Sequence, residues 1–224
     1  MAALVLLARP LQPVDVALDP GHSRADVGAV GSGLREYQLT LDLARRVRAR
    51  LEDAHLRVRL TRDDDLPLTA YTNPNATDQI QAEQEARIAA GGPARIYVSL
   101  HFNGGPTTLR GTETYFNPER TPDAASSDGT LAALLQQHVV AALAEEVGYD
   151  SLDRGVKSDL AAGKSYGHFF GLRGPVPSAL MENLFLSNAN EAALLRDDAT
   201  LDALADGCAQ GIFEYLAADD GVAD

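Results

Sequence analysis

The stretch VDVALDPGH, residues 14–22, decides the fold, because an apolar, β-rich run leads directly into a Pro-Gly turn and a histidine. Aliphatic and β-branched residues in such a run favour a strand buried in a sheet core. His22 therefore stands at a strand end. Two further runs, LRVRLT at 56–61 and ARIYVSLHF at 94–102, predict strands as well.

The segments between these strands have helical periodicity. Within residues 38–54, leucine and valine recur every four positions and share one face, which predicts a crossover helix. A second helix is expected over residues 82–90, where a pair of glycines follows as a C-terminal stop. Strands that alternate with helices in this way are typical of an α/β fold.

The second half of the chain continues the pattern. The expected elements, in chain order, are a strand at 111–117, a polar loop at 117–129, a helix at 130–147, a late strand at 179–185, and helices at 191–195 and 201–216. Two long loops, at 63–78 and 149–166, are expected to border a binding site. We predict one α/β domain whose twisted, mixed and mostly parallel sheet has about six strands, with helices on both faces.

Length and composition limit the classes of protein to which the chain can belong. With 224 residues, 45% of them hydrophobic, the chain can bury one sizeable core, and we place this domain at residues 13–218, between an N-terminal extension (1–12) and a C-terminal tail (219–224). A net charge of −13 argues against nucleic acid and anionic membrane surfaces as partners. Cys208 is the only cysteine, so any metal site must use histidine and carboxylate ligands.

The first residues, MAALVLLARPLQP, form a short apolar run. No basic segment precedes this run, and it lacks the length of a membrane span. A clear signal peptide is therefore not visible in it, and no membrane span is expected.

Four ionisable residues stand at strand ends or at the start of a helix: His22, Glu36, His101 and Glu182. Such groups cost free energy next to a sheet core unless they are paired or bind a ligand. A catalytic zinc ion commonly takes three nitrogen or oxygen ligands and leaves one position for water. The Gly-rich segment 23–35 lets the chain leave one strand end and return, and open α/β sheets place their sites at such ends.

The order of motifs resembles the zinc-dependent N-acetylmuramoyl-L-alanine amidases, which cut the amide that joins muramic acid to the stem peptide of peptidoglycan. The matching motifs span nearly the whole chain. They are LDPGH at 18–22, the Asp, Gly and Ala at 26, 28 and 29, GLRE at 33–36, LTRDDD at 60–65, VSLHFN at 98–103, GTETYF at 111–116, DRGVK at 153–157 and ENLFLSN at 182–188.

By this resemblance His22, Glu36 and His101 are the ligands of a single Zn²⁺ ion, and Glu182 is the catalytic carboxylate beside the zinc-bound water. An amide is a poor electrophile with a poor leaving group. The metal must therefore polarise the carbonyl, while the carboxylate takes the proton of the water and gives it to the departing amine. Asn103, Arg87 and Glu113 are expected to support the ligands or to contact substrate.

The resemblance implies a hydrolase of cell-wall degradation and biogenesis, with peptidoglycan as partner and an extracytoplasmic place of action. The resemblance does not decide whether the chain needs a protein activator. Four positions depart from the usual family pattern, and the loop at 69–83 looks inserted relative to the simplest members. These positions are Ser23, Arg24, Ala90 and Leu184. None of the four is an expected metal ligand, so they bear on substrate fit.

Each expected site residue also has a structural interpretation. A strand-end histidine is often hydrogen-bonded without binding a metal, and Glu36 suits a helix N-terminus. Glu182 has Arg173 as an alternative partner, and Asn103 suits a turn as well as it suits a supporting role. The remaining histidines, at positions 55, 138 and 168, are interpreted as structural or solvent-facing.

Two rival functions are compatible with these residues. One is a module that binds muropeptide without cutting it, and the other is a metal-free glycosidase that uses Glu36 and Glu182 as its carboxylate pair. The run GAVGSG at 28–33 superficially suggests a dinucleotide loop, but its spacing does not match GxGxxG. The acidic run at 63–65 is interpreted as a solvated loop.

Overall fold

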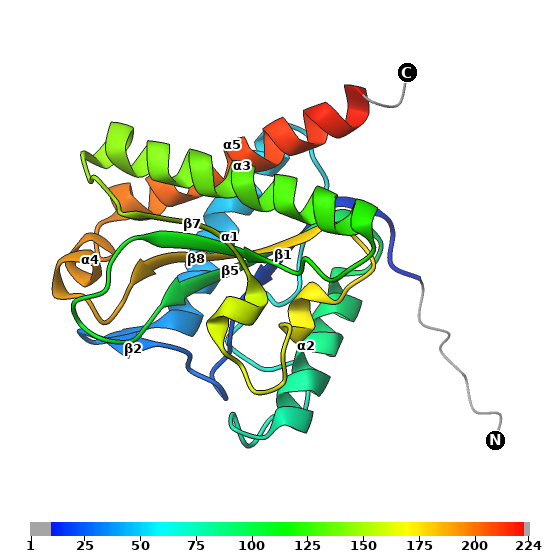
Figure 1. Cartoon of the computed structure of the whole chain (residues 1–224), viewed down its shortest axis with the longest axis horizontal. Coiled ribbons are helices and arrows are strands. Elements are labelled where there is room, and N and C mark those ends of the chain that lie inside the picture. Colours follow the sequence, from blue (N-terminus) through cyan, green and yellow to red (C-terminus); the bar gives the residue numbers. More distant parts are fainter. Residues whose placement is uncertain (1–9, 222–224) are drawn as a thin grey trace, which may run out of the picture.

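The structure is a computed structural model that describes residues 10–221. Its middle layer is a six-stranded sheet (Figure 1). In spatial order the strands are β4 (Val58–Leu60), β1 (Val14–Pro20), β5 (Ala94–Asn103), β8 (Ser178–Phe185), β6 (Thr112–Phe116) and β7 (Asp153–Ser158). The first four run parallel, β6 pairs antiparallel with β8, and β7 is parallel to β6.

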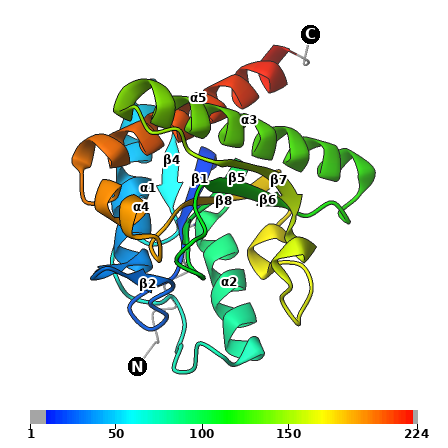
Figure 2. The ribbon, with the colours of Figure 1, turned by 60° about the vertical axis from the view of Figure 1, so that its left-hand side comes forward.

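Helices cover both faces of the sheet. Figure 2 shows α2 on the side of the sheet away from α3 and α5. The helices are α1 (Glu36–Asp53), α2 (Thr77–Gly91), α3 (Pro122–Val147), α4 (Ala189–Leu194) and α5 (Asp198–Gly221). Because α5 packs against both α1 and α3, and these two helices cover opposite halves of the sheet, the three helices form one layer, while α2 packs with the short helix η2 (Phe170–Leu172) on the other face. The predicted fold class is confirmed.

The core lies mainly between the sheet and the three-helix layer. Leu18, Val98 and Met181 from three neighbouring strands are fully buried there against leucines of α1 and α3. Two glycines of α5 bring that helix against the backbone of α3. A Cβ at Gly207 would lie 2.6 Å from the Cα of Val139, so a larger residue would force the two helices apart.

The polar loop predicted at 117–129 is wrong in its second half, because α3 begins at Pro122. Proline suits the first turn of a helix, and Asp123 in that turn favours the helix dipole. Farther along, buried Asp128 accepts a hydrogen bond from the backbone N–H of Ser178, at 2.9 Å, and pairs with Arg120. These tertiary contacts hold a polar sequence in a helical conformation.

The predicted loop at 149–166 also needs correction. It contains the edge strand β7 and the short helix η1 (Asp159–Ala162). Likewise α2 begins at Thr77, five residues before the expected start, and shortens the loop predicted at 63–78. The β7 sequence, which is half-buried at the sheet edge, has few large apolar residues, so the usual alternation signal of a strand is weak there.

The domain boundaries at 13 and 218 stay a prediction. The helix α5 continues to Gly221, and Asp219 and Asp220 of its last turn pair with Arg95. Most of the expected N-terminal extension, and the end of the expected tail, lie outside the described residues. Within residues 10–221, no helix combines the length and the apolar character that crossing a membrane requires.

Candidate active site

His22 follows β1 in a sharp turn, with a left-handed φ of 61° that is uncommon for a residue other than glycine. Two buried arginines hold this turn. Arg62 donates to the carbonyls of Pro20 and Gly21, both at 2.9 Å. Arg87 donates to the carbonyls of Pro20, at 2.7 Å, and His22, at 2.5 Å. Three successive carbonyls are therefore held in place, and these hydrogen bonds stabilise the strained backbone of His22.

Arg87 has its own buried counterion in Asp19, 3.1 Å away. Burial raises the pKa of Asp19, but the charge of Arg87 and hydrogen bonds from Thr61 and Ser99 outweigh it and lower the pKa to about 2. Arg87 also pairs with Glu83 in α2. The structure thus places Arg87 beneath the His22 turn, in a supporting position.

Glu36 is the first residue of α1, and its side chain reaches both histidines. Its Oε1 lies 2.9 Å from Nδ1 of His101 and accepts the backbone N–H of Phe102 at 3.0 Å. Its Oε2 lies 3.2 Å from Nε2 of His22 and accepts the N–H of Ala29 at 2.6 Å. Two backbone amides therefore orient a carboxylate that is only 3% exposed.

The short hairpin of β2 (Val30–Gly31) and β3 (Leu34–Arg35) brings Glu36 back to the end of β1, as the Gly-rich segment predicts. Two glycines make room for the side chains that meet there. A Cβ at Gly21 would lie 2.3 Å from the His101 ring, and one at Gly28 would lie 2.4 Å from Oε2 of Glu36. A larger residue at either position would therefore push a side chain of the cluster out of place.

His22, Glu36 and His101 thus form one cluster, with a ligand atom from each all within 4.8 Å of one another. Burial lowers the pKa of His22, but the charge of Glu36 and hydrogen bonds to Asp26 and Glu36 raise it to about 10. Although burial raises the pKa of Glu36, the two histidines hold it well below its usual range. The cluster therefore favours a positive charge at its centre.

Asp26 orients His22 from outside the cluster, since its Oδ2 lies 2.9 Å from Nδ1 and leaves Nε2 facing Glu36. Histidines that bind metals commonly have such a carboxylate on their other nitrogen. His101 is held differently. Buried Asn183 donates to its backbone carbonyl at 2.9 Å, where the pairing of β5 with β8 shifts register.

Glu182 lies directly across from His101 in the pairing of β5 with β8. One of its oxygens, Oε2, is buried and has no hydrogen-bond partner within residues 10–221. Burial and the charge of Glu36 raise the pKa of Glu182 well above its usual value. A buried carboxylate oxygen without a partner is costly, and such groups are common where a ligand or reactant binds.

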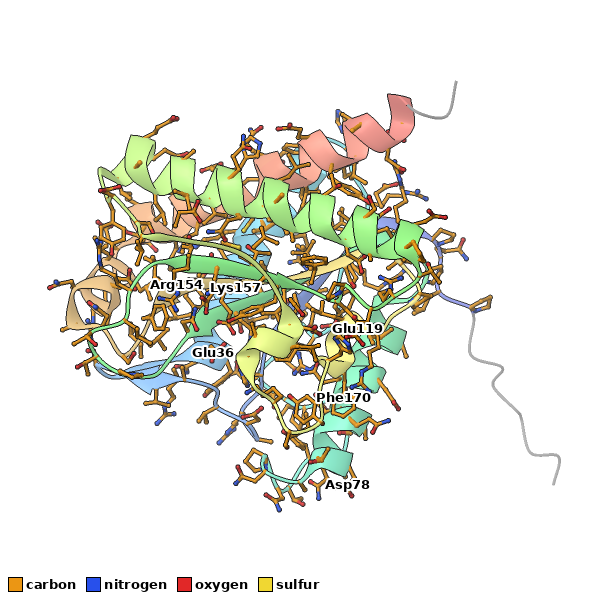
Figure 3. The ribbon with its side chains drawn as sticks, viewed as in Figure 1. Glu36, Asp78, Glu119, Arg154, Lys157 and Phe170 are labelled. Atoms are coloured by element: carbon orange, nitrogen blue, oxygen red, sulfur yellow. The ribbon has the colours of Figure 1, made fainter. Side chains whose placement is uncertain are left out.

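Glu113 and Asn103 lie beside this centre, in a polar cluster around Glu113. The Glu113 carboxylate pairs with Arg154 at 2.7 Å and with Lys157, and accepts a hydrogen bond from Asn103 at 3.2 Å. Figure 3 labels Arg154 and Lys157 close together on β7. Because Glu113 stands opposite Glu182 in the β6–β8 pairing, the two cations neutralise the carboxylate that would otherwise repel Glu182.

A cleft with two halves opens over the cluster. One half, of about 230 Å³, reaches toward α2 and is lined by Tyr71, Ile80 and Tyr166. The other, of about 490 Å³, reaches toward Asn103 and Tyr115. Residues shared by both halves are His22, Asp26, Lys164, Phe169 and Glu182. A substrate that spans the cleft would therefore pass over the cluster.

The other histidines lie apart from the cluster. His138 pairs with Glu214 between α3 and α5, and His168 is hydrogen-bonded to buried Asp159. His55 is exposed in the turn after α1. Arg173, the alternative partner of Glu182, instead lies over the Phe170 ring at 4.4 Å.

Sequence reasoning did not single out several residues that shape this site: Asp26 as the partner of His22, Arg62 beneath the turn, Asn183 behind His101, and Lys164 in the cleft. The Asp26 position lies in a matched motif, and the spacing of four residues from His22 is a signal that was present. Asn183 has a weaker signal, since a polar residue inside an apolar strand needs a buried partner. The carbonyls that Arg62 binds lie 42 and 41 positions earlier in the chain, and Lys164 meets the other cleft residues only when the chain has folded.

The fold and the site together define a class. A doubly covered α/β sheet has two histidines and a glutamate converging at strand ends, the donor set of a catalytic zinc site, with a further carboxylate beside it. This is the arrangement of a metal-dependent hydrolase. The family model described as N-acetylmuramoyl-L-alanine amidase matches residues 16–214, and the chain belongs to that family.

Relatives and solved structures agree with the family. The chain is 32% identical over 203 residues to the endolysin of Bacillus phage SPP1, covering 90% of this chain and 65% of the endolysin. The catalytic domain of CwlV from Bacillus (Paenibacillus) polymyxa var. colistinus superposes with a TM-score of 0.68 at 30% identity, covering 91% of this chain and 98% of the domain.

A further structure, the CwlD amidase from Clostridioides difficile in complex with the GerS lipoprotein, has a TM-score of 0.74 at 24% identity. It covers 92% of this chain and 100% of CwlD, and at that identity it supports the fold alone. The chain spans slightly less than two thirds of the length of the endolysin that it matches.

Proposed function

We propose that this chain hydrolyses the amide bond between N-acetylmuramic acid and L-alanine in peptidoglycan, with one Zn²⁺ ion held by His22, Glu36 and His101. The observation that carries the proposal is the convergence of these three side chains, with ligand atoms within 4.8 Å, next to the free carboxylate oxygen of Glu182. Family membership supplies the bond that is cut.

The donor set suits zinc. Two imidazoles and a carboxylate are ligands that zinc prefers, and three protein ligands leave a position for water or substrate. The carboxylates of Glu36 and Asp26 favour positive charge at this point, as the raised pKa of His22 reflects. When bound, the ion would polarise the amide carbonyl and activate a water molecule for attack.

The remaining chemistry belongs to the chain. Glu182 accepts a proton from the attacking water at its free Oε2 and then delivers it to the nitrogen of L-alanine as the C–N bond breaks. Its raised pKa suits a group that must both accept and donate a proton. Asp26 and the backbone amides around Glu36 keep the ligands oriented during this cycle.

The test combines metal analysis with mass spectrometry of peptidoglycan digests. The expected products are free peptides that begin with L-alanine, one zinc ion per chain, and loss of activity with a chelator. Glu182→Gln should keep zinc and lose roughly 10²- to 10⁴-fold in turnover, whereas His101→Ala should lose both zinc and activity. Full activity in either variant would overturn the assignment of roles.

The same digests separate the rival functions. A muropeptide-binding module would retain substrate without releasing peptide. A glycosidase would release new reducing sugar ends and would resist the chelator. Glu36 bonded to both histidines weighs against its use as a glycosidase carboxylate.

The substrate implies action outside the cytoplasm, at the cell wall. A protein partner is a further element of the proposal, because CwlD, a structure similar to this chain, was solved in complex with the GerS lipoprotein. Assay of the isolated chain decides whether a partner is needed. Turnover of purified peptidoglycan without additions would make an activator unnecessary.

A further inference from the structure

The segment from Asp159 to Arg173 forms the cleft wall that faces His22 and Asp26, and it is hereafter the η1–η2 segment. Buried Asp159 anchors it by accepting hydrogen bonds from His168, at 2.6 Å, and from the backbone N–H of Phe169, at 2.8 Å. Figure 1 shows the segment beside α2, below the sheet.

An aromatic stack stiffens the other end of this wall. The rings of Tyr166 and Phe170 stack with centroids 4.7 Å apart, and the Arg173 guanidinium lies over Phe170. Arg173 also donates to the carbonyls of Tyr166 and His168, at 3.1 and 2.7 Å. The main-chain path between these anchors is therefore fixed without any substrate, which lowers the entropic cost of binding.

Lys164 lies between the two anchors. Gly163 ends η1 in a left-handed conformation, with φ 66°, and the carbonyl of Lys164 accepts the N–H of Gly167 at 3.0 Å. The side chain is exposed, and within residues 10–221 its amine takes part in no ion pair or hydrogen bond. By contrast Lys157, the only other lysine of the chain, is paired with Glu113.

The charges that line the cleft make this lysine distinctive. Among the described residues 10–221 that line the two cleft halves, Lys164 is the one lysine or arginine, and it lines both halves. The acidic residues there are Asp26, Glu36 and Glu182. A substrate carboxylate that enters this cleft meets one cation on the wall, in a chain whose net charge of −13 repels anions overall.

We propose that Lys164 is a specificity-determining residue that binds a free carboxylate on the stem peptide close to the scissile amide, so that the preferred substrate is an acidic peptide. The inference rests on the proposed function. Because Lys164 lines the junction of the cleft halves together with Glu182, its partner belongs within one or two residues of the bond that is cut.

The chemistry of the stem peptide indicates which carboxylate Lys164 would bind. L-Alanine at the scissile bond loses its own carboxyl to the next peptide link, so the first free carboxylate available is the α-carboxylate of the following residue, when that residue is glutamate joined through its side chain. Amidation of that carboxylate removes its charge and leaves its size almost unchanged. The pair of substrates therefore isolates the charge interaction.

The experiment measures kcat and KM for zinc-loaded chain on two muramoyl-L-alanyl-D-glutamate dipeptides whose side-chain carboxyl is capped as a methylamide. One has a free α-carboxylate and the other an α-carboxamide. The cap replaces the next peptide link, so the α position is the one difference in charge between the two substrates. Wild-type chain should prefer the acid by roughly fivefold in kcat/KM, through KM, as expected for a partly exposed ion pair. Lys164→Gln should bring the ratio close to one, and Lys164→Arg should restore most of it. Arg48→Gln, a matched loss of charge on α1, should keep the wild-type ratio.

Calorimetric binding of the two product peptides, the capped L-alanyl-D-glutamate with a free α-carboxylate and its α-carboxamide, gives a readout that does not need turnover. The acid should bind more tightly to wild-type chain, and added salt should shrink the difference. An equal affinity for both peptides, or a preference that survives in Lys164→Gln, would overturn the inference. Failure to cut either dipeptide, with the acid preference intact in binding, would count against the proposed function alone.

Discussion

The wall that carries His22 and the wall that carries Lys164 face the same cleft, yet different interactions hold them. Behind His22, two guanidiniums and Asp19 lie almost wholly out of solvent. The guanidiniums donate to successive backbone carbonyls, and Asp19 is the counterion of Arg87. The η1–η2 segment is held by one buried carboxylate and a partly exposed aromatic stack. Removing a partner from the buried network around His22 leaves an unpaired charge out of contact with water. Groups of the η1–η2 segment that lose a partner can instead be hydrated.

This difference matches the tasks we assign to the walls. Metal ligands need positions fixed to a fraction of an ångström, and a strained His22 backbone persists only when its surroundings are rigid. A wall that binds substrate side chains needs less precision. Variants of the wall that carries His22 should therefore lose stability and zinc affinity together. Variants of the wall that carries Lys164 should change substrate preference or the pH dependence of stability, with little loss of stability.

The largest effect is expected for Arg87→Met. This change leaves Asp19 buried without its guanidinium and frees the carbonyls of Pro20 and His22, so the free energy of unfolding should fall by about 3–5 kcal/mol. Zinc affinity should fall as well. Denaturant titration and a competitive zinc titration measure the two effects.

The matched control for this prediction is Arg48→Met on α1, where the partner Asp63 lies 3.4 Å away and both side chains are partly exposed. It should change stability by less than about 1 kcal/mol and leave zinc affinity unchanged. Equal losses in the two variants would show that burial of Arg87 is not what matters.

A smaller and more local effect is expected for Gly28→Ala. Both Gly28 and Gly33 have a left-handed φ, of 66° and 81°, so alanine at either should cost about 1–2 kcal/mol of backbone strain. Only at Gly28 would the new Cβ meet Oε2 of Glu36, at 2.4 Å, while nothing lies within 4 Å at Gly33.

We therefore expect Gly28→Ala to weaken zinc binding by roughly 10- to 100-fold, with Gly33→Ala near wild type. A competitive titration with a chromogenic chelator compares the two. Parallel loss of zinc affinity in both variants would point to strain in the hairpin and away from crowding of the cluster.

The smallest effect concerns pH and the η1–η2 segment. Burial lowers the pKa of His168, but Asp159 and Glu119, which both face its ring, raise it above the ordinary value near 6.5. A raised pKa in the folded state stabilises the fold below about pH 6.5, and this contribution is lost as pH rises through the raised value.

His168→Gln should therefore be less stable than wild type at pH 6, by about 1 kcal/mol or less, and the difference should shrink toward pH 9. Denaturant titrations at several pH values measure it. A constant difference across that range would mean that the charge of His168 contributes nothing.

Much of the fold was predictable because its signals are local. The apolar runs that became β1, β5 and β8, and the four-residue periodicity that became α1, carry their own evidence of strand and helix. The first two turns of α3 and the edge strand β7 were missed because their sequences are polar. Contacts such as Ser178 with Asp128, made across 50 positions, decide their conformation.

Some features of the site were likewise predictable from the sequence, and others were not. The sequence contained His22, Glu36, His101 and Glu182 in an order that resembles one family, and it was enough to predict the α/β fold and to nominate these four residues. Only the tertiary structure decided that Nε2 of His22 faces Glu36, that Arg87 lies beneath the turn, and that Lys164 lines the cleft. The physical reason is range: strand and helix patterns repeat within a few residues, whereas these contacts join segments that meet only when the sheet has formed.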